Sequence, residues 1–159
     1  MKNFRVGVGY DIHQLKNNNK LILGGVLIPH YKGTVAHSDG DVVIHAICDA
    51  LLGAAGLGDI GHFFPDDDDS FKDIDSTVLL KKVFKMIQQN SFFVVNIDVS
   101  IVLEVPKLKN YLLEMKLQIS KCVNISVNDV NIKATTSEKL GFIGREEGVA
   151  CYATTLIAC

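Results

Sequence analysis

The sequence predicts an α+β fold, in which strands and helices are mixed without strict alternation. Residues 92–105 alternate apolar with polar side chains, which is the period of a half-buried strand. Residues 40–55 instead repeat apolar side chains at helical spacing. Strand-like segments both open and close the chain, and helical segments do not alternate with them one by one. This pattern argues against a doubly wound parallel sheet.

Each expected element follows from a local signal. The first strand is expected at residues 4–10, and residues 20–28 are expected to form a hairpin because Gly24-Gly25 turns the chain at little steric cost. A helix over residues 40–55 is expected to begin after Ser38, a preferred N-cap residue. The other expected elements are a helix from about Asp75-Ser76, a strand at 92–105 ended by Pro106, a helix at 107–123, and strands at 130–135 and 149–157.

The composition indicates a single globular domain over residues 1–159. A formal net charge of −2 gives no footprint for nucleic acid or for an anionic membrane, so metal or backbone groups have to hold any bound anion. No apolar run reaches the roughly 18 residues that span a bilayer, and the first residues lack a signal-peptide core. The four cysteines lack CxxC spacing, so we expect small buried side chains rather than disulfides.

Asp11, His13 and His45 are candidate metal ligands. Asp11 and His13, two residues apart, share one face of a strand, which fits either a metal site or a surface hydrogen-bonded pair. His45 projects from an apolar helix, where a histidine costs free energy unless its ring nitrogens are satisfied. Together the three supply the ligand number of a catalytic zinc site, although iron and manganese accept the same ligand types. Asp41 and Asp49, four residues either side of His45, are either outer partners of this site or solvated helix residues.

Three loop motifs have both a functional and a plain interpretation. Residues 56–61 match the dinucleotide-binding G-x-G-x-x-G pattern, but a helix precedes them and Phe63-Phe64-Pro65 follows, which favours a helix C-terminus. The acidic tract 66–70 is followed by neither the glycine nor the glutamate that an EF-hand needs. Residues 134–142 carry three hydroxyls and Glu138, and they form either a locally hydrogen-bonded turn or a site for phosphate, base and a hard cation such as Mg²⁺.

Several motifs, taken together, resemble the cyclodiphosphate synthase family. They are Asp11-x-His13, His37-Ser38-Asp39-Gly40-Asp41 followed by His45, Leu57-Gly58-Asp59-Ile60-Gly61, Phe64-Pro65-Asp66, Pro106-Lys107 and Ala134-Thr135-Thr136-x-Glu138-Lys139-Leu140-Gly141-Phe142. Because they agree in order and spacing over nearly the whole chain, they are far more specific together than singly. The resemblance implies a single-domain fold with a mixed sheet and helices on one face. It also implies a homotrimer around a threefold axis, with active sites between neighbouring subunits.

The resemblance further implies a phosphorus–oxygen lyase of non-mevalonate isoprenoid biosynthesis. In the expected reaction the 2-phosphate of 4-diphosphocytidyl-2-C-methyl-D-erythritol 2-phosphate attacks the β-phosphorus, CMP leaves, and 2-C-methyl-D-erythritol 2,4-cyclodiphosphate forms. Asp11, His13 and His45 are expected to bind Zn²⁺ or another divalent transition metal, and Glu138 to bind Mg²⁺ or Mn²⁺. The alternative is a zinc-dependent hydrolase of a nucleotide or diphosphate ester, and a further one is a non-catalytic trimer that binds an isoprenoid.

The positions that match the family's site residues are spread along the chain. His37 and Thr136 are expected to stabilise the transition state, and residues 103–109 with Thr135 and Thr136 to form a cytidine pocket supplied by the adjacent subunit. The full set of expected substrate contacts is Asp11, His13, His37, Ser38, Asp59, Ile60, Gly61, Phe64, Pro65, Asp66, Asp67, Asp68, Leu103, Glu104, Val105, Pro106, Lys107, Leu108, Lys109, Thr135, Thr136, Ser137, Glu138, Phe142 and Arg145.

Phe142 and Arg145 are expected to lie at an apolar channel on the threefold axis, which holds an isoprenoid diphosphate in some members of the family. Tyr152 stands where many members carry an acidic residue, so we expect Arg145 to be balanced by Glu146 or Glu147, or by a bound anion. The expected compartment is the bacterial cytoplasm or, if a transit peptide has been removed, a plastid (stroma or apicoplast).

Overall fold

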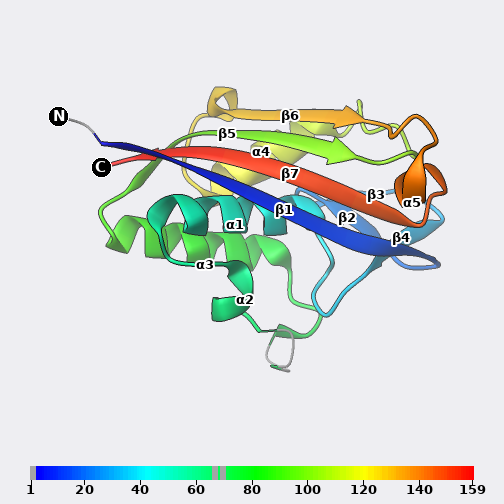
Figure 1. Ribbon diagram of the computed structural model, residues 1–159, viewed down its shortest axis with the longest axis horizontal. Coiled ribbons are helices and arrows are strands. Elements are labelled where there is room, and N and C mark those ends of the chain that lie inside the picture. Colours follow the sequence, from blue (N-terminus) through cyan, green and yellow to red (C-terminus); the bar gives the residue numbers. More distant parts are fainter. Residues whose placement is uncertain (1–2, 66–67, 69–70) are drawn as a thin grey trace.

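A five-stranded mixed sheet organises the fold (Figure 1). The computed structural model describes residues 3–65, 68 and 71–159. The strands are β1 (Phe4–Asn17), β4 (Lys32–Val35), β5 (Phe93–Val102), β6 (Val130–Thr135) and β7 (Gly148–Ala158), and β2 (Leu21–Leu23) with β3 (Val26–Ile28) forms a separate hairpin. The order in the large sheet is β4-β1-β7-β5-β6; the β5–β6 pair is parallel and the other neighbouring pairs are antiparallel.

Helices pack against the sheet and share one hydrophobic core with it. They are α1 (Val42–Ala55), α2 (Ile60–Phe63), α3 (Ser76–Gln89), α4 (Leu112–Cys122) and α5 (Gly141–Gly144), with a 3₁₀ turn at Val127–Asp129. α1 lies against β1 and β7, α3 packs against α1, and α4 packs against β6. Figure 1 shows α1 and α3 on the same side of the sheet. The prediction of an α+β fold is confirmed, and no helix in the described part of the chain is long and apolar enough to cross a membrane.

Close packing of β1 on α1 positions two of the candidate ligands. Alternate residues of β1 face α1, and one of these is Gly9. A Cβ atom on Gly9 would lie 1.9 Å from the carbonyl oxygen of Ala46 in α1, so the two backbones approach more closely than any side chain allows. Asp11 and His13 continue the same alternation and therefore face α1 as well. Both side chains are thus brought beside His45.

The opposite face of the sheet carries a row of exposed apolar side chains. On β1 these are Phe4, Val6, Val8, Tyr10 and Ile12, each between 41% and 65% exposed. Tyr152 of β7 stacks beside Tyr10, with ring centroids 4.7 Å apart. A contiguous apolar surface of this kind is typical of a protein interface.

The boundaries of two strands differ from the sequence-based expectation. β1 continues to Asn17 instead of ending near residue 10, because its polar second half still pairs with β4 and β7. Asp11 and His13 therefore lie in the middle of a strand and not at its end. In β5 a bulge between Val94 and Asn96 interrupts the simple alternation of buried and exposed residues.

Two helix boundaries also differ. The N-cap of α1 is Asp41 and not Ser38, because the Asp41 carboxylate accepts two backbone N–H groups of the first helical turn. The helix expected over residues 107–123 begins only at Leu112, and Lys107, Leu108 and Lys109 line a cavity instead.

Other expectations are confirmed. Gly24-Gly25 turns the β2–β3 hairpin, Gly56 ends α1 in the left-handed conformation with φ 75°, and Asp75 caps α3. All four cysteines are free, and Cys48, Cys122 and Cys151 are buried as expected, whereas Cys159 is exposed.

Candidate metal centre and substrate cavities

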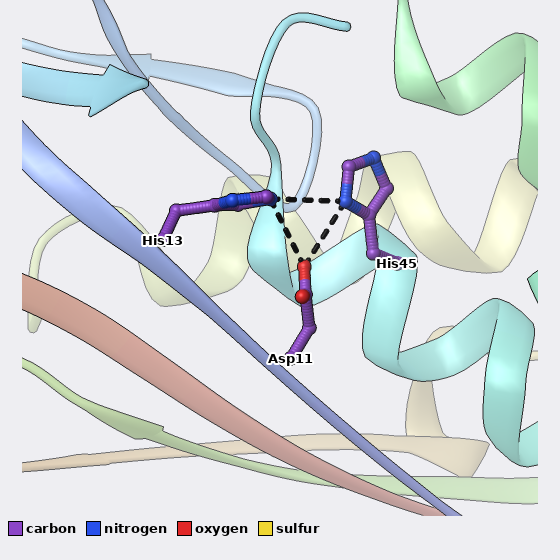
Figure 2. A group of neighbouring side chains, drawn as sticks. All are labelled: Asp11, His13 and His45. Atoms are coloured by element: carbon purple, nitrogen blue, oxygen red, sulfur yellow. Dashed lines mark hydrogen bonds and ion pairs between the residues drawn. The ribbon is translucent and has the colours of Figure 1, made fainter. Parts of the chain in front are cut away.

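Three ligand atoms from two elements meet at one point (Figure 2). Asp11 and His13 project from β1, and His45 projects from α1. Asp11 Oδ2 lies 3.0 Å from His45 Nδ1 and 3.1 Å from His13 Nε2, and those two ring nitrogens are 3.3 Å apart. Among the described residues this is the one group of three or more histidine, cysteine, aspartate or glutamate side chains whose ligand atoms are close enough together to hold a metal ion.

The spacing of the three atoms fits a tetrahedral divalent ion. Two ligands about 2.05 Å from such an ion are about 3.3 Å apart, and the observed separations are 3.0–3.3 Å. Three protein ligands leave a fourth position for substrate or water, as in catalytic zinc sites. Because imidazole and carboxylate also suit iron and manganese, the donor set indicates a divalent transition metal without selecting one.

Mutual contacts set the protonation of the ligands. Burial acts to raise the pKa of the Asp11 carboxyl, but hydrogen bonds with His13 and His45 outweigh it and hold that pKa well below its usual range. Burial acts to lower the pKa of His45, but the hydrogen bond and the charge of Asp11 reverse the shift and raise it. Asp11 is therefore an ionised ligand at neutral pH, and a metal ion competes with a proton for His45.

The second ring nitrogen of His45 contacts two serine hydroxyls. His45 Nε2 lies 2.9 Å from Ser76 Oγ and 3.2 Å from Ser38 Oγ. Ser76 was missed by sequence reasoning, because it lies 31 residues away in the first turn of α3 and no spacing rule connects it to His45.

The two carboxylates considered as partners of His45 have other roles. Asp41 is fully buried and accepts backbone N–H groups from the β2–β3 turn and from the start of α1. Burial raises its pKa to about 6, although the backbone N–H groups act to lower it. Asp49 accepts the N–H of Ile60 at 2.7 Å. Neither carboxylate bonds to the ring of His45, and Asp41 is a buried link between two elements rather than a solvated helix residue.

A cavity of about 330 Å³ opens beside the three ligands. Its walls include many of the residues expected from sequence, namely Asp11, His13, His37, Ser38, His45, Ile60, Gly61 and Phe64. The wall also includes Asp49, which was considered as a partner of His45. Sequence reasoning missed the remaining, mainly apolar wall, which consists of Val35, Ala36, Phe71, Ile74 and Leu79. Apolar residues at these positions give no signal that separates a cavity wall from the core. An apolar cavity with a few convergent polar groups is typical of small-molecule sites.

A second cavity, of about 410 Å³, lies beyond the carboxyl ends of the parallel strands β5 and β6. Its walls are Leu103, Glu104, Pro106, Lys107, Leu108, Lys109, Leu112, Ala134, Thr135 and Thr136. The segment expected to form a cytidine pocket therefore does line a cavity, with Val105 as the exception. Within one chain the two cavities share no lining residue.

Glu138 lies in the turn that follows β6 and not beside the three ligands. Its Oε1 accepts the hydroxyl of Thr136 at 3.2 Å, and its own N–H returns to the same hydroxyl at 3.3 Å. Ser137 Oγ lies 2.8 Å from the carbonyl oxygen of Leu140. The segment thus forms a hydrogen-bonded turn, and the role of Glu138 as a cation ligand stays a prediction. The candidate metal group of the described chain does not include Glu138.

Residues 59–68 contribute to the first cavity only in part. Asp59 does not line the cavity; its carboxylate caps α2 by accepting the N–H of His62. His37 Nε2 lies 3.1 Å from the carbonyl oxygen of Asp68, so its ring can donate to that carbonyl. Asp66 and Asp67, expected to contact substrate, lie outside the described residues.

Arg145 is balanced within its own chain. It donates to Glu147 through Nε at 3.1 Å and through Nη2 at 2.9 Å. Glu146, the other carboxylate considered for this role, accepts instead from Tyr31 and contacts Lys32. Phe142 is 38% exposed, at the start of the same turn.

A family model described as the YgbB family matches residues 4–158. The chain belongs to the YgbB family. Curated relatives carry the name 2-C-methyl-D-erythritol 2,4-cyclodiphosphate synthase. The relative from Prosthecochloris aestuarii is 53% identical over 153 residues, which are 96% of this chain and 98% of the relative. The relative from Thioalkalivibrio sulfidiphilus is 49% identical over 157 residues, which are 99% of this chain and 98% of the relative.

Solved structures of YgbB relatives share the fold. The bifunctional IspDF from Campylobacter jejuni superposes with a TM-score of 0.96 at 42% identity over 99% of this chain, which spans 43% of that longer protein. IspF from Plasmodium falciparum, in complex with CDP, gives a TM-score of 0.86 at 35% identity over 98% of this chain and 96% of that protein. The predictions of the family, of its α+β fold and of a lyase-type enzyme are confirmed.

Proposed function

We propose that this YgbB-family chain converts 4-diphosphocytidyl-2-C-methyl-D-erythritol 2-phosphate to 2-C-methyl-D-erythritol 2,4-cyclodiphosphate and releases CMP. The observation that carries the proposal is the group of Asp11, His13 and His45, which has the spacing of a divalent metal site and opens on a cavity of about 330 Å³. The relative that is 53% identical over 96% of the chain is named for the formation of this product.

The complete site is proposed to form between two copies of the chain in a homotrimer around a threefold axis. Two observations support this arrangement. The cavity beside the metal group and the cavity at residues 103–109 share no residue within one chain, and a substrate held between two copies could use the first cavity of one copy and the second cavity of its neighbour. The exposed apolar side chains on β1 are also of the kind that becomes buried when the same face of neighbouring copies packs together.

Residues 103–109 with Thr135 and Thr136 are proposed to bind the cytidine part of the substrate. The cavity there is lined by apolar residues such as Leu103, Pro106 and Leu108 together with Thr135 and Thr136, which suits a planar base. A structure of a relative in complex with CDP exists at 35% identity, and this supports a cytidine nucleotide as the ligand class.

The metal group is proposed to hold Zn²⁺ through Asp11, His13 and His45, and Glu138 of the neighbouring subunit is proposed to hold Mg²⁺ or Mn²⁺. When bound, these ions neutralise the diphosphate charge that otherwise repels the attacking phosphate. Glu138 is exposed, and its carboxylate accepts a hydrogen bond from the hydroxyl of Thr136. A carboxylate placed in this way can accept a hard cation at small cost in desolvation.

The chain's own residues position the substrate. In the proposed reaction an oxygen of the 2-phosphate bonds to the β-phosphorus, while the bond from that phosphorus to the bridging oxygen breaks and the oxygen leaves with CMP. No protein nucleophile takes part. His37 and Thr136 are proposed to donate hydrogen bonds to the phosphoryl oxygens, and Ser38 to hold the methylerythritol part. The apolar wall at Ile60 and Phe64 excludes water, which would otherwise hydrolyse the diphosphate.

Two further expectations remain proposals. Phe142 and Arg145 are placed by the family resemblance at a central channel that binds an isoprenoid diphosphate; the bidentate pairing of Arg145 with Glu147 has to open or be shared for an anion to bind there. The compartment is proposed to be a bacterial cytoplasm rather than a plastid, because the curated relatives described above are bacterial.

Phosphorus NMR of the products tests the proposed reaction. Purified protein is incubated with the cytidylylated substrate, Zn²⁺ and Mg²⁺, and we expect one cyclic diphosphate and one CMP per substrate consumed. Acyclic methylerythritol phosphates as the main products would replace the proposal with a diphosphate hydrolase. The matched control is His45→Ala, which should form neither set of products, so that a contaminating phosphatase is recognised.

A further inference from the structure

Ser76 occupies a position between His45 and a carboxylate. It is the first residue of α3, its side chain is completely buried, and its hydroxyl lies 2.9 Å from His45 Nε2. The Asp39 carboxylate accepts that same hydroxyl through Oδ1 and the backbone N–H of Ser76 through Oδ2, the latter at 3.0 Å. Asp39 thus holds both the start of α3 and the direction of the Ser76 hydroxyl.

The direction of the hydrogen bonds follows from what each group can do. A carboxylate only accepts, so the single hydroxyl hydrogen of Ser76 points to Asp39. The face of Ser76 Oγ that is turned to His45 then offers a lone pair, and His45 Nε2 has to carry the hydrogen. Nδ1 faces Asp11 and His13. A metal ion that replaces the hydrogen shared between Nδ1 and Asp11 leaves a neutral imidazole with its hydrogen on Nε2 and its lone pair on Nδ1.

Ser38 stands next to the same nitrogen but differs in its role. Its Oγ lies 3.2 Å from His45 Nε2 and accepts the N–H of Gly40 at 3.2 Å. Because Nε2 carries the hydrogen and directs it to the nearer Ser76, Nε2 cannot accept from Ser38. The hydroxyl hydrogen of Ser38 therefore remains available in the cavity that Ser38 lines.

We propose that Asp39 and Ser76 are positioning residues that orient His45 for metal binding through Nδ1, and that they thereby leave the Ser38 hydroxyl free to donate to a substrate oxygen. The inference rests on the proposed metal site and deepens it. It assigns two neighbouring serines different tasks: Ser76 acts on metal affinity, and Ser38 acts on substrate affinity. A partner that orients a metal-ligating histidine typically contributes about 10–100-fold to metal affinity.

Zinc affinity separates this proposal from a merely structural role. Competition with a chromophoric chelator is measured on the purified full chain for Ser76→Ala, Ser38→Ala and Ser120→Ala. Ser120 is the matched control, because it is also a buried helical serine, in α4, whose hydroxyl donates to the carbonyl of Leu117. We expect the zinc Kd to rise about 10–100-fold in Ser76→Ala and to stay within about twofold of wild type in the other two variants. Asp39→Asn should follow Ser76→Ala.

Melting curves and kinetics complete the test. If Ser76→Ala only loses a buried hydrogen bond, its melting temperature falls equally with and without zinc. If it also loses the orientation of His45, zinc raises its melting temperature by less than it raises that of the wild type. In turnover assays at saturating zinc, Ser38→Ala should raise KM more than it lowers kcat. Wild-type zinc affinity in Ser76→Ala, or equal losses of zinc affinity in Ser76→Ala and Ser38→Ala, would overturn the proposal. Failure of the proposed cyclisation is recognised separately, from the products that the wild-type protein forms in the phosphorus NMR assay.

Discussion

Replacement of Gly9 by alanine is a direct test of how the fold positions the metal ligands. A Cβ atom at Gly9 would lie 1.9 Å from the carbonyl oxygen of Ala46 and 2.8 Å from the backbone nitrogen of Ala50. Carbon–oxygen contacts begin at about 3.3 Å, so the backbone of β1 has to retreat from α1 by about 1.4 Å. Both obstructing atoms belong to the helix backbone, which cannot rotate away as the end of a side chain can.

A displacement of this size separates the ligands on β1 from His45 on α1. Metal sites tolerate ligand distances within about 0.2 Å of the ideal, so a shift of about 1.4 Å should weaken zinc binding by more than about tenfold. Overpacking at a rigid contact also costs about 1–3 kcal/mol in the free energy of unfolding. For a chain of 159 residues this lowers the melting temperature by about 2–12 °C.

The assay compares Gly9→Ala with Gly53→Ala by zinc competition and thermal melting. Gly53 lies on the exposed side of α1, and an added Cβ there has no atom within 4 Å. Alanine at this position should stabilise the helix by about 0.5–1 kcal/mol and leave zinc affinity unchanged. A folded Gly9→Ala protein with wild-type zinc affinity would refute the claim that the bare backbone of β1 sets the ligand spacing.

Four further predictions concern the site and its surroundings. His45→Ala should lose bound zinc and turnover together, and wild-type zinc stoichiometry in the purified variant would remove His45 from the ligand set. Glu138→Gln should lose most turnover and its Mg²⁺ dependence while zinc stays bound, with the exposed Glu114→Gln as the control; normal Mg²⁺ dependence of Glu138→Gln would exclude the role. Calorimetry should show tighter binding of CDP than of ADP, because the cavity at residues 103–109 is expected to accept cytosine, and equal affinities would mean that it binds phosphate alone. Burial raises the pKa of Asp41 from 3.8 to about 6, so its protonated form stabilises the fold below about pH 4 and this stabilisation is lost as the pH rises through about 6. Between about pH 4 and about pH 6, the free energy of unfolding of the metal-free wild-type protein should therefore fall by about 3 kcal/mol relative to that of metal-free Asp41→Asn. Parallel pH profiles of the two proteins would contradict the raised pKa.

The parts of the fold that sequence reasoning predicted are those with strong local signals. Alternation and helical spacing located the strands and long helices, and the glycine pair located the hairpin turn. The exact N-cap of α1 was not accessible in this way, because Ser38 and Asp41 are both good cap residues. Asp41 is the N-cap because its carboxylate also accepts the backbone N–H groups of Gly24 and Gly25, which belong to the β2–β3 turn.

In the candidate site, too, sequence reasoning located the residues that have a distinctive local signal and missed one that does not. Asp11 and His13 share a face of one strand, and His45 is conspicuous on an apolar helix, so their residue types and the family motifs located all three. Ser76 has no such signal, since a serine at the start of a helix is ordinary and its contact with His45 exists only because α3 packs on α1. Contacts of this kind depend on how the elements pack, and sequence spacing does not encode them.

The reaction run in ¹⁸O-labelled water tests the central claim most directly. In the proposed cyclisation the attacking oxygen comes from the substrate's own 2-phosphate, so mass spectrometry should find no label in either the cyclic diphosphate or the released CMP. Attack by water would place one labelled oxygen in the methylerythritol product if it occurs at the β-phosphorus, or in CMP if it occurs at the α-phosphorus. Stoichiometric label in either product, absent with His45→Ala, would contradict intramolecular cyclisation and establish hydrolysis at the same metal site.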